Sequence, residues 1–318
     1  MKRISGIALK SCISIFFIAL VLRKMNFFEL GGIFKNVSVP VLIWMFTVNY
    51  VITFFIALRW YFILDEFKEK ISFFDVWKLS LIGLYFNVLL PTGTGGDAVK
   101  ILYITRNHQE KLRLGISVIF DRFIGSSTII AMAIVSLLSY QKNLPAKLKI
   151  TLALLLIVVL SIWLLIFWDR LAIITGRIFP YRLRQKLNIF YNHLRDYGIN
   201  SRVLVNAICT SIFVQILSIY VQYLAAILVS PVSGASIPFQ LFFIFIPIIW
   251  LSSIVPSLGG LGIREYGYLF FFNSYLGKDA AIAMSLMNLM LILAQAIAGG
   301  LIFLFFRPDR QNLQRKSF

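Results

Sequence analysis

Charged residues are scarce in this sequence. Only 14% of its 318 residues are Asp, Glu, Lys or Arg, whereas 59% are hydrophobic. A soluble domain is about a quarter charged and about half apolar, so this composition excludes an ordinary soluble domain. The apolar residues come in long blocks, such as residues 150–168, which contain no charge. Since about 20 apolar residues cross a bilayer as a helix, the sequence predicts an integral membrane protein.

Cysteine and histidine are nearly absent. Cys12 and Cys209 lie in apolar segments, form neither a CxxC pair nor a disulfide framework, and are expected to be small buried hydrophobes. His108 and His193 lie in polar segments without metal-ligand spacing. No GxSxG, HExxH or Walker motif occurs, and no acidic pair suits a metal-dependent transferase. We therefore expect no cofactor, no metal and no enzyme active site.

Acidic residues are few, with 13 Asp and Glu against 31 Lys and Arg, a formal net charge of +18. No zinc spacing or RNA-binding signature accompanies this charge, so nucleic acid is not an expected partner. Basic residues beside apolar spans mark the cytoplasmic side and contact anionic headgroups. Most of them fall on one side if both termini are cytoplasmic, including seven in 169–202. The predicted location is the cell membrane, with multiple crossings.

The expected fold is an all-α, polytopic transmembrane helical bundle. Two interrupted segments, 79–105 and 239–275, predict re-entrant hairpins, because Leu79–Leu90 before Pro91 spans only about 18 Å. The segments that are long enough to cross are 4–22, 39–63, 115–140, 150–168, 203–229 and 280–306.

A single membrane domain, 1–318, is expected, with two halves joined by a basic linker. The linker has apolar residues at helical spacing, which fits an amphipathic helix on the inner leaflet and an ordinary connecting helix equally well. The predicted parts are a first half 1–168, the cytoplasmic linker 169–202, a second half 203–306 and a basic cytoplasmic tail 307–318.

The two interrupted segments have the same form. In each, an apolar helix ends at a proline, Pro91 or Pro256, a Gly-rich turn follows, and a short charged helix begins. They lie about half the chain length apart, and the predicted topology opens them to opposite sides of the membrane. Such a pair indicates an inverted-repeat transporter.

Charged and glycine residues around these breaks are the candidate substrate-binding groups. Arg122 and Arg264 are the best phosphate ligands, because a guanidinium binds phosphate through a bidentate fork. Irregular Gly-rich backbone followed by a helix N-terminus suits an anion as well. The predicted binding residues are Arg122, Arg264, Asp97, Lys100, Asp121, Glu265, Gly95, Gly96, Gly259 and Gly260.

Structural alternatives exist for all of these residues. Glycines let membrane helices pack closely, and Asp97 and Glu265 in a first turn stabilise the helix dipole. Asp121 and Arg122 sit one to two turns into the span that starts near Gly115, and as neighbours they face different directions. Each therefore needs its own partner, which we expect from the second interrupted segment, 239–275. A structural cluster of ion pairs remains the alternative to a binding site.

Three motifs resemble one family. They are Pro91-x-Gly-x-Gly-Gly-Asp97-Ala-Val-Lys100, Asp121-Arg122-Phe-x-Gly125 and Pro256-x-x-Gly-Gly-Leu-Gly-Ile-Arg264-Glu265. In this order they resemble the lysylphosphatidylglycerol synthase transmembrane region, or flippase-like, family over roughly residues 5–305. The resemblance implies a helical bundle that, in long members, moves an aminoacylated phospholipid between leaflets while a separate soluble domain makes that lipid. This chain ends at Phe318, so aminoacyl transfer is not expected.

Stand-alone members are associated with cell-envelope lipid or polyprenyl-phosphate-sugar pathways. The leading hypothesis is a lipid flippase that alternates access by rocking of its repeats. The alternatives are a membrane-embedded enzyme or accessory subunit acting on a lipid-linked substrate, and a transporter of a small soluble anion. Expected partners are membrane lipids and a lipid headgroup, with a second copy of the chain or a lipid-modifying enzyme as further candidates.

Overall fold

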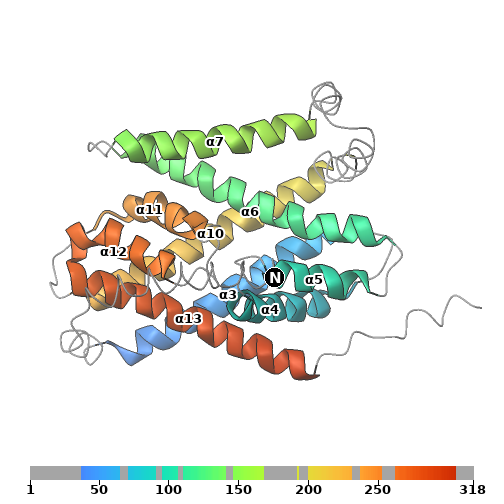
Figure 1. Cartoon of the computed structure of the whole chain (residues 1–318), viewed down its shortest axis with the longest axis horizontal. Helices are drawn as coiled ribbons and strands as arrows, with labels where there is room; N and C mark the ends of the chain where they lie inside the picture. The colour runs from blue at the N-terminus through green and yellow to red at the C-terminus, as the bar shows by residue number, and fades with distance from the viewer. Residues whose placement is uncertain are drawn as a thin grey trace, which may run out of the picture. The chain divides into compact units, whose positions relative to one another are not determined.

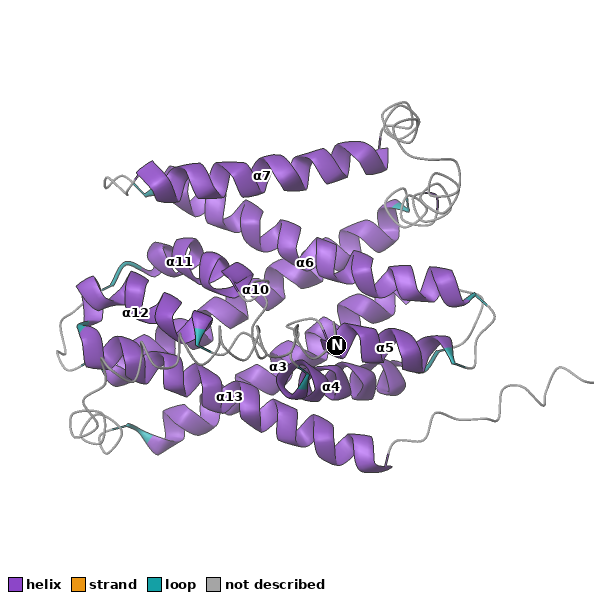
Figure 2. Ribbon diagram, in the orientation of Figure 1, coloured by secondary structure: helices purple, strands orange, loops and turns teal. Residues whose placement is uncertain are grey.

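The computed structural model describes residues 37–64, 71–90, 95–106, 110–140, 146–167, 192, 200–230, 237–252 and 262–305. Within these ranges every regular element is an α-helix and there is no strand (Figures 1 and 2). The all-α prediction is confirmed for this part of the chain.

Among the described residues, four helices are long and apolar enough to cross a membrane. They are α3 (Val39–Leu64), α6 (Lys111–Ser139), α10 (Ser201–Val229) and α13 (Lys278–Phe305). All four match predicted spans, with ends that differ by at most a few residues. The crossing predicted at 4–22 and the tail 307–318 lie outside the described residues, together with almost all of the predicted linker.

Helix α7 (Ala146–Phe167) corresponds to the span predicted at 150–168. Its described apolar stretch, Leu148–Leu164, is shorter than the four long helices. One side packs on α6, where the ring of Trp163 lies 5.1 Å from that of Phe123 and its Nε1 donates to Ser127 Oγ at 3.2 Å. Large apolar side chains such as Leu154 are exposed on α7, as expected for a surface that faces lipid tails.

The exposure of Cys209 contradicts the prediction that both cysteines are buried. Cys209 lies on α10 and is exposed, so the prediction that it is buried was wrong. In a membrane helix an exposed thiol can face lipid, which is as apolar as a protein core. Cys12 lies outside the described residues.

The structure describes two helices in each of the interrupted segments. The first comprises α4 (Phe73–Leu89) and α5 (Gly95–Thr105), and the second comprises α11 (Phe239–Ser252) and α12 (Ile263–Leu276). Helix α4 has 17 residues and not the 12 expected before Pro91, because it starts at Phe73, ahead of the predicted Leu79. At 1.5 Å per residue it is about 26 Å long, still somewhat short of the hydrocarbon thickness.

Helices α11 and α12 run antiparallel. As residue numbers fall along α11, the residues that they contact on α12 rise. Gly277 then separates α12 from α13 with a positive φ of 82°. The contacts that show the direction are Ile249 with Gly267, Phe245 with Phe271, and Phe242 with Phe272.

The chain divides into two compact units, each built from segments that are distant in sequence. The described residues of unit 1 fall within Met1–Phe54, Lys78–Val99 and Ile216–Phe306, and those of unit 2 within Phe55–Trp77 and Lys100–Gln215. Each unit therefore draws on both predicted sequence halves. The division of the chain into those halves stays a prediction.

Candidate functional site

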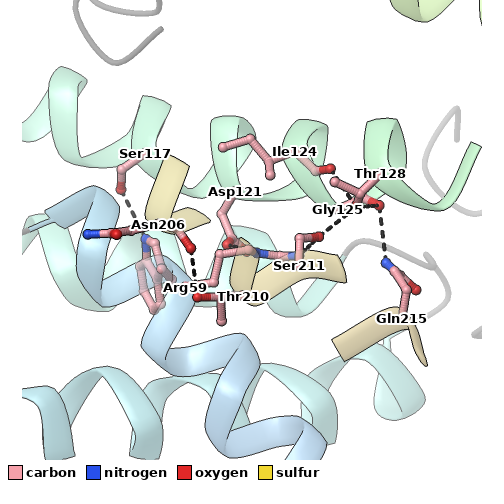
Figure 3. Close-up of polar contacts among 11 residues, drawn as sticks. Arg59, Ser117, Asp121, Ile124, Gly125, Thr128, Asn206, Thr210, Ser211 and Gln215 are labelled. Carbon is pink, nitrogen blue, oxygen red and sulfur yellow. Dashed lines mark hydrogen bonds and ion pairs between the residues drawn. The ribbon is translucent and has the colours of Figure 1, made fainter. Parts of the chain in front are cut away.

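An ion pair is buried between α3 and α6 in unit 2. Arg59 donates from Nε to Asp121 Oδ1 at 2.6 Å and from Nη2 to Oδ2 at 3.0 Å (Figure 3). Each residue is only 5% exposed. The two groups meet in a bidentate fork, the strongest arrangement of this pair. The structure thus places two opposite charges inside two candidate membrane spans.

Helix α10 completes the surroundings of this pair. Nη1 of Arg59 donates to Ser211 Oγ at 3.0 Å, and that hydroxyl lies 2.6 Å from Thr128 Oγ1. One turn after Ser211, Gln215 donates from Nε2 to the carbonyl oxygen of Gly125 at 3.2 Å. Figure 3 shows these side chains pointing toward one another from three helices. Hydrogen bonds therefore join α3, α6 and α10 at the ion pair.

The contacts of α6 come from one face of the helix. Ser117, Asp121, Gly125 and Thr128 follow at intervals of three or four residues, which places them on one side. A Cβ at Gly125 would lie 2.8 Å from Nη1 of Arg59. Gly125 therefore leaves the space that the guanidinium occupies. The motif Asp121-Arg122-Phe-x-Gly125 supplies both the counter-ion of Arg59 and the room for it.

Lys100 lies beside this network. Its Nζ is 5.2 Å from the ring centroid of Trp60, within the range of a cation–π contact. Trp60 in turn donates from Nε1 to Ser117 Oγ at 3.1 Å, on the face of α6 that carries Asp121. Lys100 is 8% exposed. Of the predicted binding residues, the structure thus brings Lys100 and Asp121 into the same group of contacts.

The partner of Asp121 differs from the expectation. We expected it in the second interrupted segment, but it is Arg59 on α3. Asp121 also lies deeper than expected, because α6 begins at Lys111 and so places it almost three turns into the helix. Arg122 is exposed while Asp121 is buried. Their different directions, expected from helix geometry, are confirmed.

Gly96 holds α5 against α4 in unit 1. Its N–H donates to Asn87 Oδ1 at 2.8 Å, and a Cβ there would lie 1.8 Å from the carbonyl oxygen of Gly83. The two backbones therefore touch, and one N-terminal N–H group of α5 already has an acceptor. This geometry favours close packing as the role of Gly96. Gly95 is buried as well, and Asp97 is half-buried in the first turn of α5.

Helix α13 contacts α4 through another glycine pair. A Cβ at Gly299 would lie 2.0 Å from the carbonyl oxygen of Leu81, and one at Gly300 would lie 3.1 Å from the ring of Tyr85. Small residues commonly allow such approaches between membrane helices. Helix α4 is therefore in backbone contact with both α5 and α13.

Glu265 caps the start of α12. Its carboxylate accepts from the backbone N–H of Gly262, and it is 9% exposed. This matches the structural alternative, in which an acidic group stabilises a helix N-terminus. Arg264 is half-buried in the same turn. Gly259 and Gly260 lie outside the described residues.

Amide side chains connect helices in unit 1. Tyr268 donates from its hydroxyl to Gln222 Oε1 at 2.9 Å, and Gln222 donates from Nε2 to Asn288 Oδ1 at 2.7 Å. Gln295 on α13 donates to Asn49 on α3. Such bonds across helices are the usual role of amides in membranes. They give these residues a packing function without need of a ligand.

Sequence reasoning missed Arg59, Gly125 and Ser211 as members of one site. Arg59 was not among the predicted binding residues, although it is a charged residue within the predicted span 39–63. A charged residue inside a span usually has a partner, and Asp121 is the acidic residue within the predicted span 115–140, so the pair could have been proposed. No feature of the sequence predicted the hydroxyl contacts of Ser211 and Thr128 or the amide contact of Gln215. Among the described residues, no group of three His, Cys, Asp or Glu could hold a metal.

The long apolar helices define a polytopic helical membrane protein, and an ion pair is buried between two of its candidate spans. The chain belongs to the family described as the lysylphosphatidylglycerol synthase TM region, whose model matches residues 7–304. It is thus a membrane protein related to lipid modification or transport. Among curated proteins, no match was found.

Proposed function

We propose that this protein is a flippase that moves a lipid with an anionic, phosphate-containing headgroup between leaflets. The headgroup would be that of an aminoacylated phospholipid or of a polyprenyl-phosphate-linked sugar. Membership of the family supports a lipid-related function. The proposal is of a transporter and not of an enzyme.

The buried polar network around Arg59 and Asp121 carries the proposal. Charged residues inside membrane spans are costly and commonly mark substrate pathways. A headgroup that crosses the hydrocarbon needs polar partners there, and α3, α6 and α10 supply a guanidinium, hydroxyls and an amide. A bundle that served only as an anchor would not need these groups.

The interrupted segments suggest how access alternates. We propose that both are re-entrant hairpins facing opposite leaflets and that the repeats rock against each other. The antiparallel packing of α11 on α12 supports this for the second segment, because an antiparallel pair enters and leaves on one side. For the first segment, the contact of Gly96 with Gly83 supports a chain that turns back on itself.

Arg122 and Arg264 are proposed to contact the headgroup on its way. Arg122 is exposed on α6, and Arg264 lies in the first turn of α12 beside the second break. A guanidinium at each position would offer phosphate a bidentate ligand.

Reconstitution into vesicles tests this function. Fluorescently labelled lipids with different headgroups are added to purified protein in liposomes, and movement is followed by dithionite bleaching of the outer leaflet. We expect the protein to move at least one phosphate-containing lipid. Arg122→Ala and Arg264→Ala should each abolish movement with folding intact, whereas Arg202→Ala, at an exposed cation in the first turn of α10, should have no effect. Normal transport by both arginine variants would remove those residues from the site, and no movement of any lipid by the wild type would reject the function.

A further inference from the structure

We propose that Arg59 is the group that binds the substrate's phosphate, and that Asp121 is an internal counter-ion which this phosphate displaces. The inference rests on the proposed function and names the residue that binds the phosphate of the headgroup. It differs from the sequence-based expectation, which placed Arg122 and Arg264 there.

The bonds of Arg59 have the form that phosphate requires. Nε and Nη2 each donate to one oxygen of the Asp121 carboxylate, at 2.6 and 3.0 Å. A phosphate group presents two oxygens to the same fork, which is why arginine recognises both anions. The carboxylate thus occupies the position that a phosphate would take.

Further donors surround this position. The hydroxyls of Ser211 and Thr128 hydrogen-bond to each other at 2.6 Å, and Ser211 also accepts from Arg59. A hydroxyl can rotate to a new acceptor, so both can turn toward phosphate oxygens. The absence of a side chain at Gly125 keeps α6 clear of Nη1 of Arg59.

Stability alone gives a weak reason for this pair. Replacing a buried ion pair with apolar residues of similar volume is often neutral or stabilising, and in a membrane the charges are more costly still. An exchangeable counter-ion gives a better reason. If phosphate replaces carboxylate directly, Arg59 is never left without an anion in a medium of low dielectric constant.

The pair also lies within reach of one membrane surface. Arg59 is five residues from the end of α3 at Leu64, about 8 Å, and Asp121 is ten residues from the start of α6 at Lys111, about 15 Å. The predicted topology places both helix ends on the cytoplasmic side. A headgroup from the cytoplasmic leaflet would therefore have a short path to Arg59.

An apolar double variant separates this role from a structural one. Arg59→Met/Asp121→Leu should fold, because it removes both charges together. In vesicles of phosphatidylethanolamine and phosphatidylglycerol, its movement of NBD-labelled phosphatidylglycerol should fall about tenfold or more, as expected when a hydrogen bond to a charged group is lost. Wild-type movement by the folded double variant would show that the pair is only structural and overturn the inference.

A matched control removes a different polar contact of the same helix. Asn49→Leu/Gln295→Leu breaks the bond between α3 and α13 and leaves the ion pair in place. It should retain wild-type movement of phosphatidylglycerol. If it loses as much transport as the charge-free variant, any polar contact of α3 matters equally and the special role of Arg59 is refuted.

A conservative variant covers the case in which the double variant does not fold. Arg59→Lys keeps the positive charge but loses the fork, so it should fold and bind phosphate weakly. Binding is measured as the rise in melting temperature that short-chain phosphatidylglycerol produces in detergent. We expect this rise in the wild type and a much smaller one in Arg59→Lys. An equal rise in both proteins overturns the inference whether or not lipid transport is observed.

Three probes identify the source of the phosphate. NBD-phosphatidylglycerol carries it on a lipid, radiolabelled inorganic phosphate carries it free, and an NBD-labelled glucosyl diacylglycerol lacks it. We expect movement of phosphatidylglycerol alone, and loss of that movement in Arg59→Lys. Uptake of inorganic phosphate that depends on Arg59 would keep the phosphate site but make the substrate a soluble anion. Equal movement of the phosphate-free lipid would refute phosphate recognition.

Discussion

Replacing Gly96 with alanine should force α4 and α5 apart. The added Cβ would lie 1.8 Å from the carbonyl oxygen of Gly83, against the 3.4 Å at which ordinary contact begins, so the backbones would have to separate by about 1.6 Å. The neighbouring atom belongs to the backbone and has no rotamer into which it could move. The strain must therefore be taken up by a shift of a whole helix.

The expected loss in the free energy of unfolding follows from two opposing effects. Overpacking of a close contact costs about 1–3 kcal/mol, and the backbone neighbour points to the upper end of that range. Alanine in a helix returns up to about 1 kcal/mol relative to glycine. We expect a net loss of about 2 kcal/mol, which would lower the melting temperature by several degrees.

Thermal unfolding of purified protein in detergent measures this effect, with Gly115→Ala as the control. A Cβ at Gly115 would lie 3.5 Å from Ile101 Cγ2, an ordinary contact, so this variant should be as stable as the wild type or slightly more so. An unchanged melting temperature for Gly96→Ala would contradict the packing argument. If transport were lost at the same time, the result would favour the sequence-based alternative, in which Gly96 lies next to a bound anion.

Further variants test two contacts in unit 1. Glu265→Ala removes the cap on the N–H of Gly262 and should cost about 1 kcal/mol of stability. Glu265→Gln keeps an acceptor oxygen and should cost less, so equal falls in melting temperature would contradict the capping role. Tyr268→Phe removes the bond to Gln222 and should cost about 1–2 kcal/mol, because it leaves a buried acceptor unsatisfied. Combined with Gln222→Leu the two losses should not add, and full additivity would refute the coupling of these side chains.

Most of the helices could be predicted because hydropathy and helix breaks are local properties. The apolar runs at α3, α6, α10 and α13 are each long enough to identify a span on their own. The boundaries were less accurate where polar residues extend a helix beyond its apolar stretch. Helix α6 starts at Lys111, ahead of the predicted residue 115, because its basic first turn continues the same helix.

The candidate site was predictable only in part. Asp121 was selected because a charge inside a span is unusual, and Lys100 because it follows a Gly-rich break. Both lie in the group of contacts around Trp60 and Arg59. The partner of Asp121 was assigned to the wrong segment, because a partner on another helix depends on how the two helices are rotated against each other. The spacing of residues along one helix gives no information about that rotation.

By itself, the sequence determined that this chain is a helical membrane protein of a lipid-related family, with two helix breaks and a few charges at membrane depth. These properties follow from segment length, apolar content and the backbone preferences of Pro and Gly. Only the tertiary structure decided that Arg59 binds Asp121, that Gly125 makes room for the guanidinium, and that Gly96 touches Gly83. Such contacts join residues that are up to 66 positions apart, as Arg59 and Gly125 are, and they exist because helix packing brings particular faces together.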